Sequence, residues 1–250
     1  MLRIEQWLAG RDFARDDPNA APMVNFVYLV ADDATRQAML VDPAWDVDGL
    51  VRKVEQEGYT LAGTLATHYH PDHVGGDLWG LEVAGIARVA EIAPAARTHA
   101  HADEAPWIER VTGVKAKDLV LHAAGDAITL GKGSVRIEFV HTPGHSPGST
   151  CYLVSDPDTP DDRPGSVGQP ALFTGDTLFV QGCGRVDLPG SDPDEMHRTL
   201  TERLAKLPAP TVVYPGHDYG PSPTSTLERE RRQNPYLRSG SLEAWRRVMG

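Results

Sequence analysis

Short apolar runs recur along the chain and are separated by turn residues, a pattern typical of buried strands. Residues 2–8, 23–30 and 37–41 form the first three runs, and the acidic pair Asp32-Asp33 between the last two predicts a hairpin. Later runs have the same character and lie at residues 61–66, 127–130, 134–140, 150–155, 171–174 and 211–214. We expect each of these runs to form a strand.

Other segments carry apolar residues at helical spacing. Residues 47–58 do so, with Asp46 or Asp48 as the candidate N-cap and Gly58 as the stop. Further helices are expected at residues 103–111, 116–121 and 194–207 and after Pro223. Strand-rich blocks alternate with these helices without a repeat or a linker. We therefore expect one α/β domain over residues 1–250, with helices covering sheets and a helical C-terminal tail from about residue 223.

A dense group of metal-type residues follows the apolar run that ends at residue 66. The pattern H-x-H-x-D-H places three imidazoles and a carboxylate at His68, His70, Asp72 and His73. We expect a helix to begin behind the next two glycines, in residues 74–81, so that the group lies on a strand-to-helix turn. Imidazole and carboxylate are ligands of zinc, iron and manganese. A lone histidine would be an ordinary polar residue, but this spacing at a strand end indicates a metal site.

Three further ligand-type residues lie beside glycines after later apolar runs, at His145, Asp176 and His217. Together the seven residues suffice for two metal ions if one carboxylate bridges them. Two such cations, about 3.5–4 Å apart, could generate a hydroxide nucleophile at neutral pH. The sequence contains no G-x-S-x-G motif, and Cys183 has no base near it in the sequence, so a serine or cysteine nucleophile is not indicated.

A second histidine pattern, His99-Ala100-His101-Ala102-Asp103, copies the first ligand positions of this group. It is followed by Glu104 instead of a histidine, and no glycine pair comes after it. We expect this stretch to be a solvated loop or the start of a helix, and not a metal site.

Charge and composition narrow the function further. The formal net charge is −11, from 24 lysines and arginines against 35 acidic residues, which disfavours binding to nucleic acids or anionic membranes. The two cysteines have no paired spacing, so a reducing compartment fits best. Neither an N-terminal signal pattern nor an apolar run of membrane length is visible. We expect a cytoplasmic protein.

Four motifs together resemble the metallo-β-lactamase-fold superfamily. They are THYHPDH (67–73), TPGHSPGS (142–149), FTGDTLF (173–179) and YPGHDYG (214–220), and the resemblance covers about residues 20 to 235. It implies a four-layer αββα sandwich of two mixed sheets with metal at one edge. It also implies that His68, His70 and His145 hold a first metal ion. A second would be held by Asp72, His73 and His217. Asp176 would bridge the two ions, and Asp72 would also orient the attacking water.

Within this superfamily, Gly182-Cys183-Gly184-Arg185 is similar to glyoxalase II thioesterases and to persulfide dioxygenases. In both groups the basic residue that matches Arg185 contacts the carboxylate of glutathione, a contact that suits a guanidinium. A surface arginine in a glycine-rich loop is the alternative interpretation.

The first of these groups implies a hydrolase of a thioester such as a hydroxyacylglutathione, with two divalent ions of zinc, iron or manganese and a metal-bound hydroxide. The second implies a glutathione persulfide dioxygenase with one Fe(II), held by His68, His145 and Asp176. Only about thirty residues follow Gly220, as in the dioxygenases, whereas the motifs around Asp176 and His217 look like those of the hydrolases.

The interpretation that we prefer is a thioester hydrolase acting on a small thiol-derived substrate, with the dioxygenase as the alternative and a non-catalytic metal-binding module as a third option. Long stretches at residues 85–125 and 156–169 could reshape the substrate entrance. The sequence is compatible with a homodimer and does not determine the oligomeric state.

Overall fold

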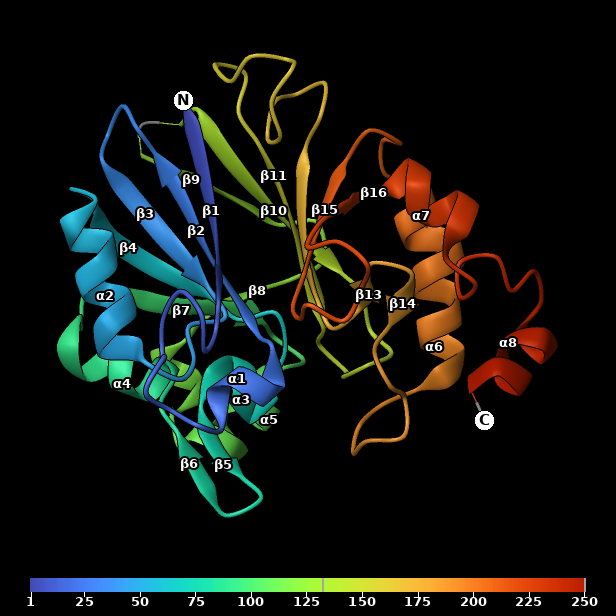
Figure 1. Cartoon of the computed structure of the whole chain (residues 1–250), viewed down its shortest axis with the longest axis horizontal. Coiled ribbons are helices and arrows are strands. Elements are labelled where there is room, and N and C mark those ends of the chain that lie inside the picture. The colour runs from blue at the N-terminus through green and yellow to red at the C-terminus, as the bar shows by residue number, and fades with distance from the viewer. Residues whose placement is uncertain (132, 250) are drawn as a thin grey trace.

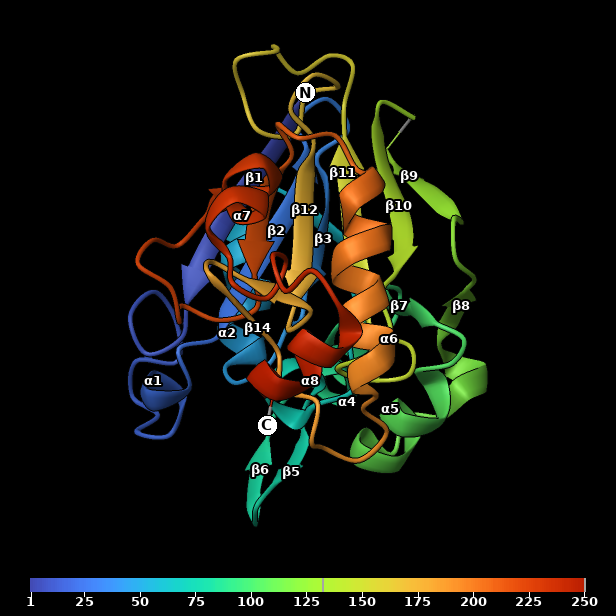
Figure 2. The ribbon, with the colours of Figure 1, turned by 90° about the vertical axis from the view of Figure 1, so that its right-hand side faces the viewer.

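Two six-stranded mixed sheets face each other, and helices cover the outer face of each sheet (Figures 1 and 2). The computed structural model describes residues 1–131 and 133–249. The strand order is β1-β2-β3-β4-β7-β8 in the first sheet and β16-β15-β12-β11-β10-β9 in the second. The expected αββα sandwich is therefore confirmed.

The first sheet is built from the N-terminal half of the chain. Its strands are β1 (Leu2–Leu8), β2 (Phe26–Asp32), β3 (Gln37–Val41), β4 (Thr60–Leu65), β7 (Arg97–His101) and β8 (Val120–His122). The first three strands pair antiparallel, whereas β3, β4, β7 and β8 run parallel.

The second sheet comes from the C-terminal half. Its strands are β9 (Ala127–Leu130), β10 (Val135–His141), β11 (Thr150–Ser155), β12 (Ala171–Gly175), β15 (Val212–Pro215) and β16 (Ser225–Thr226). All neighbours pair antiparallel except β12 and β15, which are parallel. Two small hairpins complete the strands, β5 (Gly76–Leu78) with β6 (Leu81–Val83) and β13 (Leu178–Phe179) with β14 (Gly182–Cys183).

Strand β2 shows how the apolar pattern builds the layers. Tyr28 and Val30 belong to the core between the two sheets, whereas Val27 and Leu29 belong to a second core under the helices of the first sheet. Side chains of a strand point alternately to its two faces, so a continuous apolar run is buried on both sides.

Helices on the first sheet include α2 (Val47–Gln56), where the Asp46 carboxylate accepts a hydrogen bond of 2.8 Å from the Gly49 amide, as an N-cap does. The others on this side of the molecule are α1 (Ala20–Met23), α3 (Pro71–Val74), α4 (Ile86–Ile92) and α5 (Ala105–Thr112). The second sheet is covered by α6 (Pro193–Arg198), α7 (Leu227–Gln233) and α8 (Leu242–Met249). Helix α6 continues through a π-helical segment, Thr199–Arg203, and a 3-10 turn, Leu204–Lys206.

The prediction of a helix in residues 74–81 is wrong. Helix α3 ends before the glycine pair, where Gly75 and Gly76 have φ angles of 87° and 114° that a helix cannot continue. The chain then forms the β5–β6 hairpin, whose turn is made by Trp79 and Gly80, both with positive φ. Two consecutive positive φ values suit the tight turns of hairpins.

The predictions for residues 99–103 and 116–121 are also corrected. The first three residues of the second histidine pattern, with His101 buried, lie in strand β7, which pairs in parallel with β4 and β8. Ala102 and Asp103 follow in a turn. Residues 116–121 form a 3-10 turn at Ala116–Asp118 and then enter β8 instead of forming a helix.

Among residues 1–131 and 133–249 we find no helix with the length and apolarity needed to cross a membrane.

Candidate metal centre

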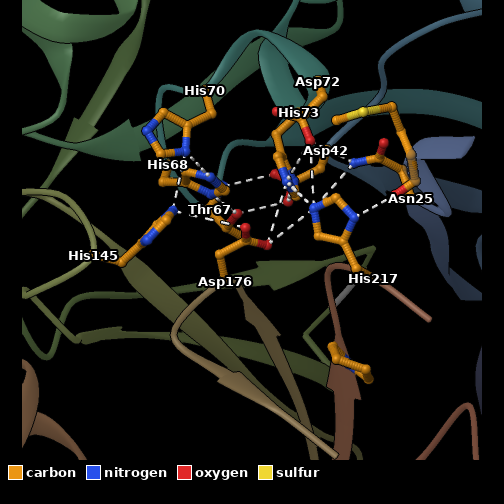
Figure 3. A network of polar contacts seen from close by, with 12 residues as sticks. Asn25, Asp42, Thr67, His68, His70, Asp72, His73, His145, Asp176 and His217 are labelled. Carbon is orange, nitrogen blue, oxygen red and sulfur yellow. Dashed lines mark hydrogen bonds and ion pairs between the residues drawn. The ribbon is translucent and has the colours of Figure 1, made fainter. Parts of the chain in front are cut away.

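The seven ligand-type residues predicted from the sequence meet at one edge of the sandwich (Figure 3). Four of them follow strand β4, and His145 lies on the turn between β10 and β11. Because β12 and β15 are parallel neighbours, Asp176 and His217 leave the second sheet at the same edge. Gly216 makes room for this meeting, since a Cβ atom there would lie 2.6 Å from Asp176 Oδ1.

One triad consists of His68, His70 and His145. The Nδ1 atom of His70 lies 3.0 Å from His68 Nε2 and 3.0 Å from His145 Nε2. Nitrogen atoms bound to one zinc ion at about 2.0–2.1 Å lie roughly 3 Å apart, so this spacing fits a shared cation. Burial lowers the pKa of all three imidazoles, that of His70 to about 3. They are therefore neutral at physiological pH and have lone pairs free for a metal.

A second triad consists of Asp72, His73 and His217. The two Nε2 atoms lie 3.1 Å apart, and Asp72 Oδ2 lies 3.5 Å from His73 Nε2 and 3.3 Å from His217 Nε2. Burial opposes the ionisation of Asp72, but the two imidazoles outweigh it and hold the pKa of this carboxyl well below its usual range. Burial also lowers the pKa of the imidazoles, yet the carboxylates of Asp72 and Asp176 raise it overall.

Asp176 lies between the two triads. Its Oδ1 atom is 3.4 Å from His73 Nε2 and 3.5 Å from His217 Nε2, and its Oδ2 atom is 3.7 Å from His145 Nε2. Oδ1 is buried and has no hydrogen-bond partner among the residues that the structure describes. A buried carboxylate oxygen without a hydrogen bond is costly, and a cation on either side would satisfy it. The donor set therefore fits two divalent ions.

Outer contacts fix the orientation of the imidazoles. His145 Nδ1 lies 2.8 Å from the Arg185 carbonyl, and His217 Nδ1 lies 2.7 Å from the Met23 carbonyl. Such contacts at the outer nitrogen leave the inner nitrogen for a metal. His73 Nδ1 is held in the same way, 3.0 Å from Asp42 Oδ2.

Sequence reasoning missed three buried residues that support the centre. Asp42, at the end of β3, also accepts hydrogen bonds from the Thr67 amide and hydroxyl at 2.8 and 2.6 Å. Asn25 donates to Asp72 Oδ2 at 3.1 Å and accepts from the indole of Trp45 at 3.1 Å. The only sequence signal for either was that Asp42-Pro43 ends a strand.

Glu104 is the third missed residue, and it joins two ligand-bearing loops. Its carboxylate accepts hydrogen bonds from the Tyr69 amide at 2.7 Å, the Ser146 hydroxyl at 2.7 Å and the Gly148 amide at 2.6 Å. Burial raises the pKa of Glu104 to about 7. Tyr69 lies between His68 and His70, and Ser146 follows His145, so one side chain ties both halves of the first triad together.

Arg185 lines a cavity of about 680 Å³ that opens beside the two triads. Its guanidinium forms two hydrogen bonds of 2.7 Å with Asp187. A substrate carboxylate would have to compete with that carboxylate, so the predicted contact with substrate remains a prediction.

The histidines of the second pattern lie apart from this centre. His101 stacks on His141 with ring centroids 3.9 Å apart and an angle of 7° between the planes, and His99 Nδ1 lies 2.9 Å from His122 Nε2. Lone pairs lie in the ring plane, so two parallel stacked imidazoles are poorly arranged to share one cation.

Known proteins resemble this chain over most of its length. The family model described as "Metallo-beta-lactamase superfamily" matches residues 20–159 and 163–217. The chain is 30% identical over 213 residues to the "Probable polyketide biosynthesis zinc-dependent hydrolase BaeB" of Bacillus velezensis, covering 85% of this chain and 81% of that protein. It is 35% identical over 195 residues to a hydroxyacylglutathione hydrolase of Polaromonas sp., covering 78% of this chain but only 62% of that protein.

A solved structure, that of ETHE1 from Myxococcus xanthus, superposes with a TM-score of 0.75 and 27% identity. The superposition covers 99% of this chain and 89% of that one. The likeness therefore extends over both sheets and the helical tail.

Proposed function

The chain belongs to the metallo-β-lactamase superfamily, a superfamily of metal-dependent enzymes, and we propose that it is a thioester hydrolase. The observation that carries this proposal is the pair of triads joined by Asp176, whose buried Oδ1 atom has no hydrogen-bond partner among the residues that the structure describes. When bound, two divalent cations of zinc, iron or manganese would supply Lewis-acid charge that polarises a carbonyl and lowers the pKa of water. A single cation in the first triad would leave the second triad, Asp72, His73 and His217, without a metal to bind.

The ligand assignment follows the geometry of the two triads. His68, His70 and His145 would hold one cation, and Asp72, His73 and His217 the other, with Asp176 between them. Asp72 is kept ionised by its neighbours, so it can accept a hydrogen bond from the attacking water and orient it. Asn25 fixes the Asp72 carboxylate by its amide hydrogen bond.

The nearby cysteine does not compete as a nucleophile. Cys183 lines the cavity, but burial raises the pKa of its thiol to about 12, so the reactive thiolate is not formed at neutral pH. A thioester also suits a site without a dedicated acid, because a thiol has a pKa of about 8.5 and leaves readily as a thiolate.

An assay of the metal-loaded protein tests this proposal. Protein freed of metal is reloaded separately with zinc, iron(II) or manganese(II) and offered a panel of thioesters that includes S-D-lactoylglutathione. We expect hydrolysis by at least one loaded form, loss of activity with a chelator and recovery when metal is restored. A panel that is not cleaved by any loaded form would refute the proposal.

Persulfide dioxygenase is the second candidate. It is favoured by the likeness to the ETHE1 structure, which covers 99% of this chain, together with 28% identity over 97% of this chain to the "Persulfide dioxygenase ETHE1, mitochondrial" of Mus musculus. Fe(II) would then be held by His68, His145 and Asp176, which leaves coordination positions open. Oxygen uptake by the iron-loaded protein on addition of glutathione persulfide separates this activity from thioester hydrolysis.

A further inference from the structure

The β5–β6 hairpin stands away from the body of the molecule (Figures 1 and 2). Trp79 lies in its turn, because Leu78 pairs with Leu81. Trp79 is 86% exposed, more than any other large apolar side chain among residues 1–131 and 133–249. Tyr219 is 58% exposed. Both residues line the cavity beside the two triads. Large apolar side chains left open to water around a functional cavity indicate a ligand that covers them.

The cavity wall is mostly aromatic and aliphatic. Its aromatic residues are Tyr69, Trp79, Phe179, Tyr219 and Tyr236, and they come from five different segments of the chain. At about 680 Å³ the cavity falls within the range of roughly 300–1,000 Å³ that is usual for small-molecule sites. It has room for an acyl group much larger than acetyl or lactoyl.

The lining side chains outside the metal centre offer few partners for an anionic ligand. Apart from the two triads and Asp176, its charged lining residues are Asp77 and Arg185. Asp77 accepts a hydrogen bond from the Gly80 amide at 3.1 Å, and Arg185 is paired with Asp187. In the part of the chain that the structure describes, no lysine and no unpaired arginine lines the cavity. A thiol carrier with several carboxylates would therefore find no free cationic side chain there.

We propose that the cavity binds a large apolar acyl group of the thioester and that Trp79 selects for it. This inference rests on the proposed hydrolase function and specifies its substrate class. The reaction is R–CO–SR′ + H₂O → R–COO⁻ + R′–SH + H⁺, in which water adds to the carbonyl carbon, the C–S bond breaks and the sulfur leaves as a thiolate that takes up a proton. The chain R lies against the aromatic wall, under the hairpin.

The first experiment uses acetyl, hexanoyl and decanoyl thioesters of N-acetylcysteamine, a neutral thiol, with the zinc-loaded protein. We expect kcat/KM to rise with chain length, by up to roughly fourfold for each methylene that becomes buried. Trp79→Ala should flatten this rise, with a larger loss of kcat/KM on the decanoyl ester than on the acetyl ester, because the longer chain has more apolar surface to bury. Trp79→Phe should restore part of the slope.

A matched control is Leu121→Ala, which removes an exposed apolar side chain that does not line the cavity. This variant should keep the full dependence on chain length. Rates that do not depend on chain length, or an equal loss on all esters in Trp79→Ala, would overturn the inference while the hydrolase function stands.

If no thioester is cleaved, a binding measurement tests the apolar subsite separately from the hydrolase function. S-decyl-N-acetylcysteamine is a thioether without the carbonyl, so it cannot be hydrolysed. We expect it to protect Trp79 from quenching by acrylamide, measured as the difference in fluorescence between the wild type and Trp79→Phe. Protection without any hydrolysis would refute the hydrolase function and retain the apolar subsite, whereas unprotected Trp79 would refute the subsite.

Discussion

Asp72 is the residue on which the proposed chemistry depends most directly. It is buried, its pKa is held low by His73 and His217, and Asn25 donates to its Oδ2 atom. Replacing it in Asp72→Asn keeps the size of the side chain but removes the charge that orients water. We expect some metal to be retained and kcat/KM for thioesters to fall by about 10²–10⁴.

Metal content and kinetics measured on the same sample check this prediction. Asp77→Asn serves as the matched control, because Asp77 is an exposed carboxylate of the same cavity that contacts neither triad. Its kcat/KM should stay close to that of the wild type. Unchanged turnover in Asp72→Asn would remove Asp72 from the mechanism.

Glu104 is expected to matter for a different reason. Glu104→Gln places an amide NH₂ group against the backbone amides of Tyr69 or Gly148, so a buried donor loses its acceptor. We expect the free energy of unfolding to fall by about 1–3 kcal/mol. Because the first triad is spread over the two loops that Glu104 joins, its zinc affinity should also fall.

Urea unfolding and zinc competition against a chromophoric chelator measure the two effects. Asp103→Asn, an exposed neighbour, should show neither of them. An unfolding free energy that drops while zinc affinity is unchanged would limit Glu104 to a purely structural role.

These residues also show what could be predicted at this scale. The seven ligand-type residues could be found because they follow apolar runs and because three of them, His145, Asp176 and His217, stand beside glycine. Glu104 could not, since its partners Tyr69 and Ser146 lie 35 and 42 residues away and only the fold brings them together.

At the scale of the element, the β5–β6 hairpin depends on glycines with different surroundings. Gly76 has a φ of 114°, and a Cβ atom there would lie 2.2 Å from the Val111 carbonyl oxygen. Gly80 has a φ of 88° but faces open space. Gly76→Ala combines strain with a clash, so we expect a loss of about 2–4 kcal/mol in unfolding free energy.

Gly80→Ala is the matched variant, with strain alone and an expected loss of about 1–2 kcal/mol. Urea unfolding of both variants gives the comparison. Equal losses would show that contact with the α5 segment does not fix the base of the hairpin.

The same hairpin marks the limit of prediction for elements. The apolar pattern predicts strands such as β1 and β3 with their observed bounds, because a short apolar run flanked by turn residues fits a buried strand better than a helix. Residues 74–81 fit a helix equally well by spacing. The difference lies in the backbone angles of Gly75, Gly76 and Trp79, which depend on packing that is distant in sequence.

At the scale of the whole molecule, the two triads should respond differently to pH. His68, His70 and His145 have lowered pKa values and stay neutral as the pH falls, whereas the pKa values of His73 and His217 are raised. A cation must displace a proton from each protonated ligand, so its affinity falls below the pKa of that ligand.

We therefore expect the second triad to lose its metal first when the pH is lowered from about 8 to about 5, on either side of the usual histidine pKa of about 6.5. Metal retained after dialysis at each pH measures this order. His217→Ala, in which only the first triad is complete, identifies the pH at which that triad releases its ion. Simultaneous loss of both ions from the wild type, or retention of the last ion only above the pH found for the first triad, would contradict the prediction.

The central claim is that two metal ions held by this centre serve thioester hydrolysis. The most direct test is a zinc titration of the metal-free protein in which bound zinc and hydrolysis of decanoyl-N-acetylcysteamine and S-D-lactoylglutathione are recorded on the same samples. We predict saturation at about two zinc ions per chain, with hydrolysis of at least one ester rising as the second ion binds. Saturation at one ion, with both esters intact and rapid oxygen uptake by the iron-loaded protein on glutathione persulfide, would contradict it.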